Sequence, residues 1–243
     1  MVQSAETVGV LVNPPRTLFR YLQGIRRKTR GDRFDRFKAF VQEVRTASGN
    51  KDGILQVLDV GGTKVFWENW WRISEQDRLH VTLLNDYKLY PDEKTWQSTG
   101  SMIDSVCQDA TTLTPADLSK YDLIFSNSTL EHLQTRKAQK ALAKMIATSG
   151  LPYFIQVPNK FSPIDPHRPY FPFFALYPSP IRSRIGPGPA YKVLENGKRW
   201  KMDYSPLGVR DMKEFFPTAS FTIEKPFGIP MSILACRTSP AAD

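Results

Sequence analysis

Two apolar runs that stop abruptly at small or polar residues constrain the fold of this chain more than any other feature. The first, at residues 54–58, is followed by Asp59, Gly61 and Gly62. The second lies within YDLIFSNSTLEHL, at 121–133, and ends in the same way. In an open α/β sheet, ligands bind outside the carboxyl ends of the strands, and glycine lets the backbone approach a ligand closely. The sequence therefore predicts a ligand site where the two runs end.

Strand-like and helix-like segments alternate along the chain. We expect strands at 54–60, 79–85, 105–108, 122–125 and 153–157, and helices at 17–28, 33–48, 65–73, 134–147 and 205–216. Runs at 221–224 and 232–236, separated by a turn with two prolines and a glycine, predict a closing hairpin. This pattern is typical of an α/β, Rossmann-like, doubly wound sheet of seven mostly parallel strands with a C-terminal antiparallel hairpin.

The pattern changes after residue 158. Residues 158–199 contain nine prolines and many aromatic side chains but little periodicity. Such a segment indicates an ordered, irregular excursion that covers the sheet rather than a strand or a linker. We therefore divide the chain into a basic N-terminal helical extension at 1–50 and an α/β domain at 51–243. A Pro/aromatic-rich lid insertion at 158–200 lies within that domain.

Positive charge is concentrated near the N-terminus. The segment from Arg16 to Lys38 has nine basic residues against two acidic ones, and the whole chain has a net charge of +9. We favour a solvated helical face with apolar side chains packing beneath it. Contact with an anionic partner, such as a phosphorylated substrate or an anionic membrane surface, stays open. No nucleic-acid-binding signature accompanies the charge, and we expect no nucleic acid partner.

Composition indicates the cellular compartment in which we expect the chain to work. We see no apolar N-terminal stretch after a positive start and no run long enough to span a membrane. Cys107 and Cys236 each lie in an apolar run, which favours buried free thiols over disulfides. We expect a cytoplasmic protein, peripheral to the inner face of the membrane if the basic segment binds lipid. We predict no metal site, and nothing indicates an oligomeric state.

Four segments, in order, resemble those of the class I S-adenosylmethionine-dependent methyltransferases, and the bacterial small-molecule and glycan subset in particular. They are VLDVGGT at 57–63, VTLLN at 81–85, VCQDA at 106–110 and YDLIFSNSTLEHL at 121–133. Asp59 and Gly61 match the family's Asp/Glu-x-Gly-x-Gly-x-Gly loop, whereas Thr63 and Val65 stand at its later glycine positions. The resemblance implies the family's fold and methyl transfer to an unidentified small-molecule, glycan or lipid-linked acceptor.

The resemblance also implies how S-adenosylmethionine would be held. Its ribose diol and its two amines can donate hydrogen bonds to carboxylate or carbonyl oxygens. Asp59 would hold the loop or the amino group, and N–H groups near Gly61–Thr63 would bind the carboxylate. Asn85 or Asp86 would bind the ribose, and Asp109 the adenine amine. The cofactor-binding residues predicted in this way are Asp59, Gly61, Gly62, Thr63, Asn85, Asp86, Asp109, Ala110, Ser126 and Asn127.

The acceptor side is predicted from the segments that follow the fourth and fifth strands. His132 lies near the end of one strand. After the next strand, His167 is the last residue of a Pro-Asn-x-x-x-Pro-x-x-Pro-His pattern, and Arg168 comes directly after it. We predict catalytic roles for His132 and His167, and acceptor contacts for Glu131, His167 and Arg168. A structural alternative stays open for each, such as a capping box between Ser128 and Glu131.

Two other functions were compared with methyl transfer. A nicotinamide-dependent short-chain dehydrogenase needs a Tyr-x-x-x-Lys pair far down the chain, and the pair at Tyr90 and Lys94 lies too near the glycines. A non-catalytic binding or scaffold protein with the same fold, membrane-peripheral through its basic segment, remains the alternative.

Overall fold

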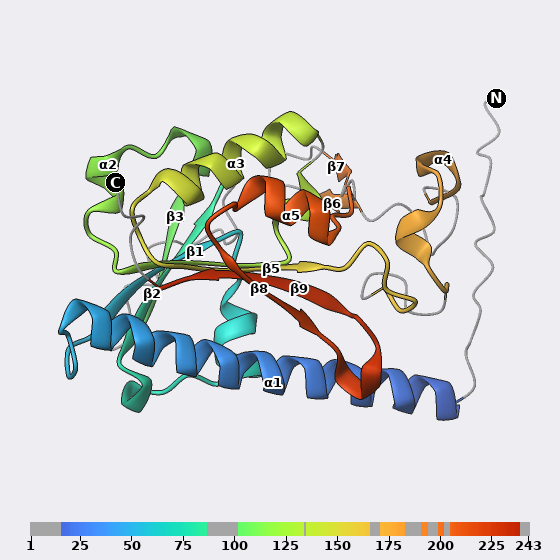
Figure 1. The fold of residues 1–243 in the computed structure, drawn as a ribbon, viewed down its shortest axis with the longest axis horizontal. Coiled ribbons are helices and arrows are strands. Elements are labelled where there is room, and N and C mark those ends of the chain that lie inside the picture. Colours follow the sequence, from blue (N-terminus) through green and yellow to red (C-terminus); the bar gives the residue numbers. More distant parts are fainter. Residues whose placement is uncertain are drawn as a thin grey trace.

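A mixed sheet of seven strands forms the centre of the molecule (Figure 1). The computed structural model describes residues 16–86, 102–133, 135–165, 171–182, 191–193, 199–201 and 205–238. The strands of the sheet are β1 (Leu55–Val60), β2 (Leu79–Asn85), β3 (Ile103–Cys107), β4 (Leu123–Asn127), β5 (Tyr153–Pro158), β8 (Ser220–Glu224) and β9 (Ser232–Arg237). Their order is β3-β2-β1-β4-β5-β9-β8.

The first five of these strands are parallel, and the last two close the sheet as an antiparallel pair. β1 pairs in parallel with β2 and with β4, so the strand order reverses between β1 and β4. β9 is antiparallel to both β5 and β8. The predicted α/β fold class and its C-terminal hairpin are therefore confirmed. The reversal point is where an open α/β sheet binds ligands.

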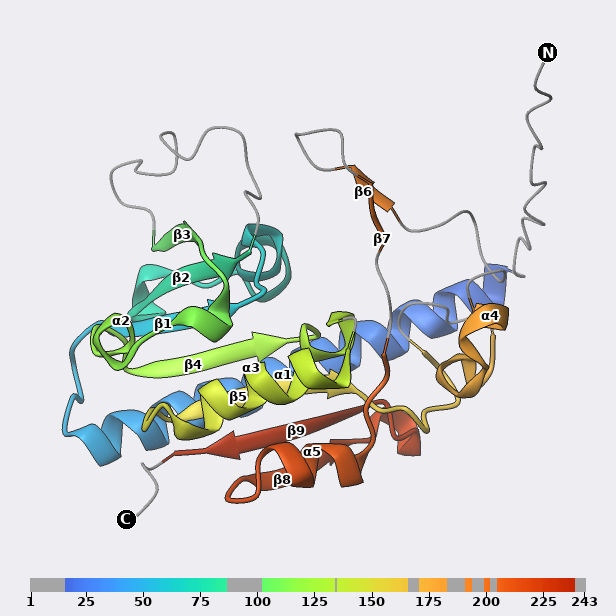
Figure 2. The same cartoon turned by 90° about the horizontal axis from the view of Figure 1, so that it is seen from above.

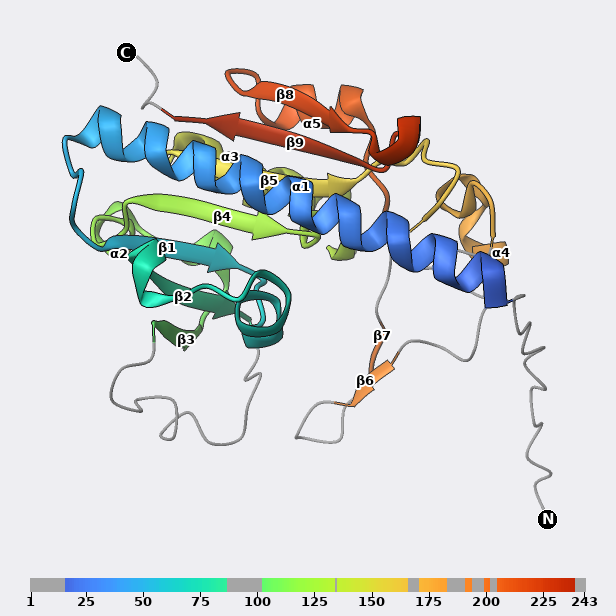
Figure 3. The same ribbon diagram turned by 90° about the horizontal axis from the view of Figure 1, so that it is seen from below.

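Helices cover both faces of the sheet. α3 (Arg136–Thr148) and α5 (Val209–Phe215) lie on one face, near β5 and β9 (Figure 2). α1 (Arg16–Ser48) lies on the opposite face and runs along β5, between β4 and β9 (Figure 3). The sheet is thus buried on both sides, and most buried positions of β1 and β5 have apolar side chains, with Asp59 and Gln156 as polar exceptions.

α1 is one continuous helix, so the prediction of two helices separated by Gly31 is wrong. Gly31 is exposed, and no atom lies where its Cβ would be. A glycine inside a helix costs about 1 kcal/mol relative to alanine. Burial of Leu22, Ile25, Phe37 and Val44 along one stripe of α1 outweighs that cost.

An aromatic layer joins α1 to the sheet. The fully buried ring of Phe37 lies 5.1 Å from the ring of Phe125 in β4 and 5.4 Å from that of Phe154 in β5. It also lies 5.8 Å from Trp67 and 5.1 Å from Trp71. Both tryptophans are buried and belong to the core, whereas the side chain of Trp70 lies outside the described residues.

Two predicted helices differ from the observed elements. Segment 65–73 forms the π-helix η1 (Phe66–Trp71), which ends at Arg72 in the left-handed conformation, with φ of 52°. α5 starts at Val209 rather than at residue 205, because Leu207 forms a parallel bridge with Asn159 and stays extended. A buried apolar side chain in that bridge outweighs the helix-starting tendency of the preceding proline.

The segment after β5 contains regular elements that the sequence did not indicate. Its described parts include η6 (Phe174–Leu176), α4 (Ser179–Arg182) and an antiparallel pair of β6 (Tyr191–Val193) and β7 (Arg199–Lys201). The expectation that this segment has no strands is therefore wrong. Its role as a lid and the proposed domain boundaries stay predictions.

The two cysteines differ in exposure. Cys107, at the end of edge strand β3, is exposed, whereas Cys236 in β9 is partly buried, and both are free thiols. The prediction that both are buried is wrong for Cys107, because β3 has no outer neighbour in the described sheet. Within the described ranges, no helix has the length and hydropathy needed to cross a bilayer.

If α1 is part of the core, truncating Phe37 should destabilise the whole domain. We expect Phe37→Ala to lower the free energy of unfolding by about 3–5 kcal/mol, since it leaves a cavity among four aromatic rings. Chemical denaturation monitored by tryptophan fluorescence measures the change. Tyr21→Ala, at a position on the same helix that is 53% exposed, should change stability by less than about 0.5 kcal/mol. Equal, small effects of both variants would show that α1 is only appended.

Candidate functional site

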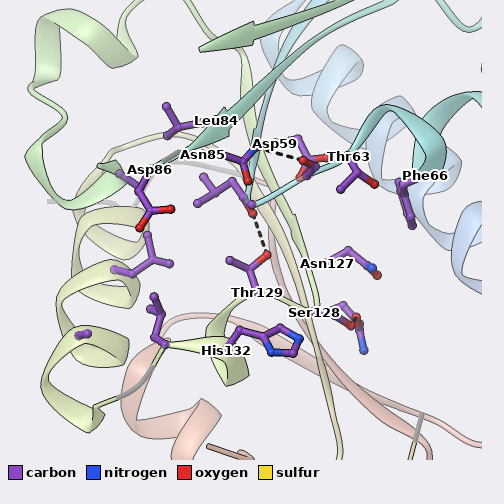
Figure 4. A pocket seen from close by; sticks show the side chains of 18 of the residues that line it. Asp59, Thr63, Phe66, Leu84, Asn85, Asp86, Asn127, Ser128, Thr129 and His132 are labelled. Atoms are coloured by element: carbon purple, nitrogen blue, oxygen red, sulfur yellow. Dashed lines mark hydrogen bonds between the residues drawn. The ribbon is translucent and has the colours of Figure 1, made fainter. Parts of the chain in front are cut away.

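A cavity of about 950 Å³ opens at the carboxyl ends of the parallel strands (Figure 4). Pockets of this size bind cofactors and small molecules. Its wall is formed by the loops after β1, β2, β3 and β4, the ends of β5 and β9, and by α1 and α3. The polar and charged residues of the wall are Thr29, Arg30, Arg33, Asp59, Thr63, Asn85, Asp86, Gln108, Asp109, Thr111, Asn127, Ser128, Thr129, His132, Thr135, Lys137, Gln156 and Ser232.

The loop after β1 needs glycine at two positions. Gly61 has φ of +78°, and a Cβ on it would overlap the side chain of Thr129. A Cβ on Gly62 would overlap the carboxylate of Asp59. The loop is held by the N–H of Gly61, which donates to the carbonyl of Leu84 at 2.8 Å. Because both glycines lack side chains, the backbone itself forms this part of the wall.

Asp59 is a buried carboxylate at the cavity wall. Its Oδ2 accepts a hydrogen bond from Nε1 of Trp67 at 2.6 Å, and its side chain is almost fully buried. None of the described residues donates to its Oδ1. Burial raises the pKa of Asp59 to about 7, and the hydrogen bond from Trp67 offsets only part of that shift. Asp59 is therefore positioned to accept a hydrogen bond from a cationic or neutral donor in the cavity.

The residues predicted after β2 and β3 also line the cavity. Nδ2 of Asn85 donates to the carbonyl of Gly62 at 3.1 Å, so the amide holds the glycine loop. Asp86 is exposed and lies beside Asn85 (Figure 4). Oδ1 of Asp109 accepts from both the N–H and the hydroxyl of Thr111 at 2.8 Å. Thr63 and Ala110 line the cavity as well.

The strand-4 segment divides between the wall and the layer beneath it. Asn127 lines the cavity, but Ser126 is fully buried and does not line it. The hydroxyl of Ser126 donates to the carbonyl of Val60 at 2.9 Å, which joins β4 to the end of β1. Ser128 adopts φ of +58°, and its hydroxyl donates to Oε1 of Gln156. The structure thus gives Ser126 a position behind the wall.

Glu131 and His132 lie in the 3-10 turn η5 (Leu130–His132). The capping box between Ser128 and Glu131 does not form, because the hydroxyl of Ser128 bonds to Gln156 and Thr129 is the N-cap. Glu131 is fully buried behind the wall, with Oε1 4.0 Å from Nε2 of His132. His132 itself lines the cavity. Glu131 therefore lies next to His132 but does not itself line the cavity.

Two predicted acceptor residues, His167 and Arg168, lie outside the described residues. Their roles in catalysis and acceptor binding stay predictions.

The sequence did not single out Arg33 as a site residue. Its guanidinium lines the cavity and forms a buried ion pair with Glu224 at the end of β8, at 2.5 Å. Nη1 of Arg33 also donates to Oδ1 of Asn127 at 2.7 Å. One signal was present: Arg33 occupies the same stripe of α1 as Ile25 and Phe37, and a charged residue in an apolar stripe needs a buried partner.

The fold matches those of solved methyltransferase structures. A proposed S-adenosylmethionine-dependent methyltransferase from Listeria monocytogenes superposes with a TM-score of 0.51 at 10% identity, over 88% of this chain and 97% of that one. This chain has the fold of the class I S-adenosylmethionine-dependent methyltransferases.

Two further structures are similar at lower scores. A Burkholderia thailandensis 1,6-didemethyltoxoflavin-N1-methyltransferase, solved with 1,6-didemethyltoxoflavin and S-adenosylhomocysteine, gives a TM-score of 0.44 at 12% identity over 95% and 92% of the chains. A proposed O-methyltransferase from Nostoc punctiforme gives 0.45 at 13% identity, where the match covers 80% of this chain and 55% of that one. The sequence matches no protein-family model, and no curated protein matches it.

Replacing Asp59 with Asn should stabilise the ligand-free protein at high pH. Because the pKa of Asp59 is raised from 3.8 to about 7 by folding, its contribution to stability is largest below about pH 4 and declines up to about pH 7. Asp59→Asn removes this penalty and keeps an oxygen for Trp67. We expect the variant to be about 2–4 kcal/mol more stable than the wild type at pH 8.

The same comparison at pH 5 should show a much smaller difference, and thermal melts at both pH values measure it. Asp122→Asn, at a position that bonds the N–H of Gln56 outside the cavity, is the matched control. A stability difference for Asp59→Asn that does not grow between pH 5 and pH 8 would contradict the raised pKa.

Proposed function

We propose that this protein binds S-adenosylmethionine and transfers its methyl group to a small-molecule, glycan or lipid-linked acceptor. The observation that carries the proposal is the position of Asp59. It is a buried carboxylate with an unused oxygen, beside two glycines that cannot bear side chains, at the reversal point of the sheet. A ligand with a donor group and a need for close backbone approach fits this corner.

The wall residues fit the polar groups of S-adenosylmethionine. Oδ1 of Asp59 would accept from the α-amino group, and the N–H groups of Gly62 and Thr63 would donate to the carboxylate. Asp86 would accept from the ribose diol, and Oδ1 of Asn85 would accept as well, because only Nδ2 of Asn85 bonds the loop. Asp109 would face the adenine amine. When bound, the cofactor supplies a methyl group on a sulfonium, which a nucleophile attacks in line.

The protein would contribute mainly orientation and exclusion of water. His132 lines the wall on the side of the cavity opposite Asn85 and Asp86 (Figure 4), and the buried Glu131 lies behind it, with Oε1 4.0 Å from Nε2 of His132. His132 would therefore take a proton from the acceptor or orient it, with His167 as the second candidate. Contact of the basic half of α1 with an anionic membrane surface would bring the site to a lipid-linked acceptor.

One observation favours the alternative, a non-catalytic binding protein. In each of two predicted cofactor-binding residues, one polar atom is already bonded within the protein: Oδ2 of Asp59 to Trp67 and Nδ2 of Asn85 to the carbonyl of Gly62. Hydrogen bonds of this kind within the protein can keep the site folded without a cofactor.

Calorimetric titration with S-adenosylmethionine and S-adenosylhomocysteine separates the two functions. We expect both to bind with micromolar Kd, and Gly62→Ala to weaken binding at least tenfold, because its methyl group displaces the Asp59 carboxylate. Gly24→Ala is the matched control, since Gly24, like Gly62, has no positive φ, but its Cβ would meet no atom and it lies away from the cavity. No binding of either ligand at millimolar concentration would rule out methyl transfer.

If His132 handles the acceptor proton, His132→Gln should lower kcat at least tenfold and change cofactor affinity less than twofold. His167→Ala tests the second candidate in the same assay, which follows transfer of labelled methyl groups. Loss of cofactor affinity in step with kcat would assign either histidine to the cofactor side.

A further inference from the structure

The charged and polar groups of the cavity are sorted by their position along the sheet. The half at the ends of β1, β2 and β3 has the three carboxylates of the wall, Asp59, Asp86 and Asp109. The half at the ends of β4, β5 and β9 is lined by α1, and its polar residues are Thr29, Arg30, Arg33, Asn127, Ser128, His132, Gln156 and Ser232. No carboxylate is among the described residues that line this second half. Lys137, the remaining basic wall residue, is on α3, which packs against η4 (Ala110–Thr112) near Asp109.

Arg33 keeps one donor for the cavity. A guanidinium has five N–H donors. Nε and Nη2 of Arg33 donate to Glu224 and Ser232, and Nη1 uses one hydrogen for Oδ1 of Asn127. The second hydrogen of Nη1 has no acceptor among the described residues. Since Arg33 is only 7% exposed, its remaining donor is fixed in direction by the ion pair.

Two amides present their donor ends in the same half. Oδ1 of Asn127 accepts from Arg33, and Oε1 of Gln156 accepts from the hydroxyl of Ser128 at 2.9 Å. Each amide oxygen is thereby engaged, so each NH₂ group points elsewhere, and neither has an acceptor in the described part of the chain. Both residues line the cavity, and Gln156 is 2% exposed. Neither nitrogen is among the buried atoms without a partner, so both donors are accessible, and a ligand oxygen in the cavity would accept hydrogen bonds from them.

We propose that this half of the cavity binds an anionic oxygen group, a carboxylate or a phosphate, of the methyl acceptor. Arg33, Asn127 and Gln156 supply oriented donors, and Arg30 on the preceding turn of α1 adds a positive charge at the wall, whereas the charge of Arg33 is paired with Glu224. Oxyanions accept several hydrogen bonds at once, and cationic donors strengthen each bond. That the anion belongs to a methyl acceptor rests on the proposed function. That an anion binds in this half rests on the geometry alone.

The different charges at the walls of the two halves would direct the cofactor and the acceptor to different halves. S-adenosylmethionine has a net positive charge near its sulfonium and amino group, which the carboxylate half favours. An anionic acceptor is repelled from that half and attracted to the other. The sorting therefore directs each substrate to its own side of the reacting methyl group.

Binding of matched probes to the protein saturated with S-adenosylhomocysteine tests the inference. Benzoate and phenyl phosphate represent the two anions, and benzamide is the neutral isostere. Ligand-observed NMR titrations should give affinities for at least one anion that are roughly tenfold or more above that for benzamide. Preference for phenyl phosphate or for benzoate identifies the phosphate or the carboxylate as the natural group. Equal affinities for all three probes would overturn the inference.

Two variants locate the binding group. Arg30→Gln should lower the affinity for the preferred anion about five- to tenfold. Arg27→Gln, the same change at an exposed position of α1 outside the cavity, should lower it less than twofold. Asn127→Asp keeps the oxygen that accepts from Arg33 but replaces the NH₂ donor with a second oxygen, and it should abolish the preference for anions. Equal losses in the Arg27 and Arg30 variants would show a diffuse charge effect and overturn the inference.

The cofactor's own carboxylate is the competing occupant of these donors. Arg30→Gln and Asn127→Asp are therefore also titrated with S-adenosylhomocysteine and with 5′-methylthioadenosine, which lacks the amino-acid part. Weakening of the first ligand alone would assign the donors to the cofactor and overturn the inference. If S-adenosylhomocysteine does not bind the wild type, the proposed function fails. The probe titration is then repeated without it, and its outcome still decides whether the anion site exists.

Discussion

Phe37 packs against Trp67, Trp71, Phe125 and Phe154, and this aromatic layer fixes α1 on the face of the sheet. Two consequences for the site follow from that one contact. Trp67 is held where its Nε1 reaches the carboxylate of Asp59, and the turn of α1 before Phe37 brings Arg33 to the ends of β4 and β9. The apolar layer therefore positions the polar groups on both sides of the cavity.

Those polar groups are buried at a cost that the protein offsets in two different ways. The carboxylate of Asp59 has one hydrogen bond and a pKa of about 7, so its negative charge is only partly stabilised before a ligand arrives. The guanidinium of Arg33 forms a buried ion pair with the carboxylate of Glu224, which holds it in place. One half of the cavity thus gains stability when a cationic donor binds. The other half presents a preformed arrangement of donors.

The sequence predicted the sheet, its hairpin and most of the carboxylate half, because each of those residues lies at the end of an apolar run with period-two or continuous burial. Asp59, Asn85 and Asp109 are recognisable from their own segments. Arg33 and Gln156 are not recognisable in this way, because their roles depend on tertiary contacts. Arg33 and Glu224, for example, are far apart in the chain. Local periodicity cannot place α1 against β8, and Gly31 even suggested a break that the buried stripe of α1 overrides.

The loop after β1 has fewer glycines than the family pattern, and the geometry explains why two are enough. Gly61 and Gly62 stand where a Cβ would meet Thr129 and Asp59, and Gly61 needs a positive φ that costs other residues about 1–3 kcal/mol. Thr63 meets neither condition, since its side chain lines the open cavity and its carbonyl accepts from Phe66 at 3.0 Å. Glycine is retained only where the backbone must turn or approach a neighbour. The threonine at the second glycine position of the pattern therefore adds a hydroxyl to the wall without narrowing the close approach that Gly61 and Gly62 provide.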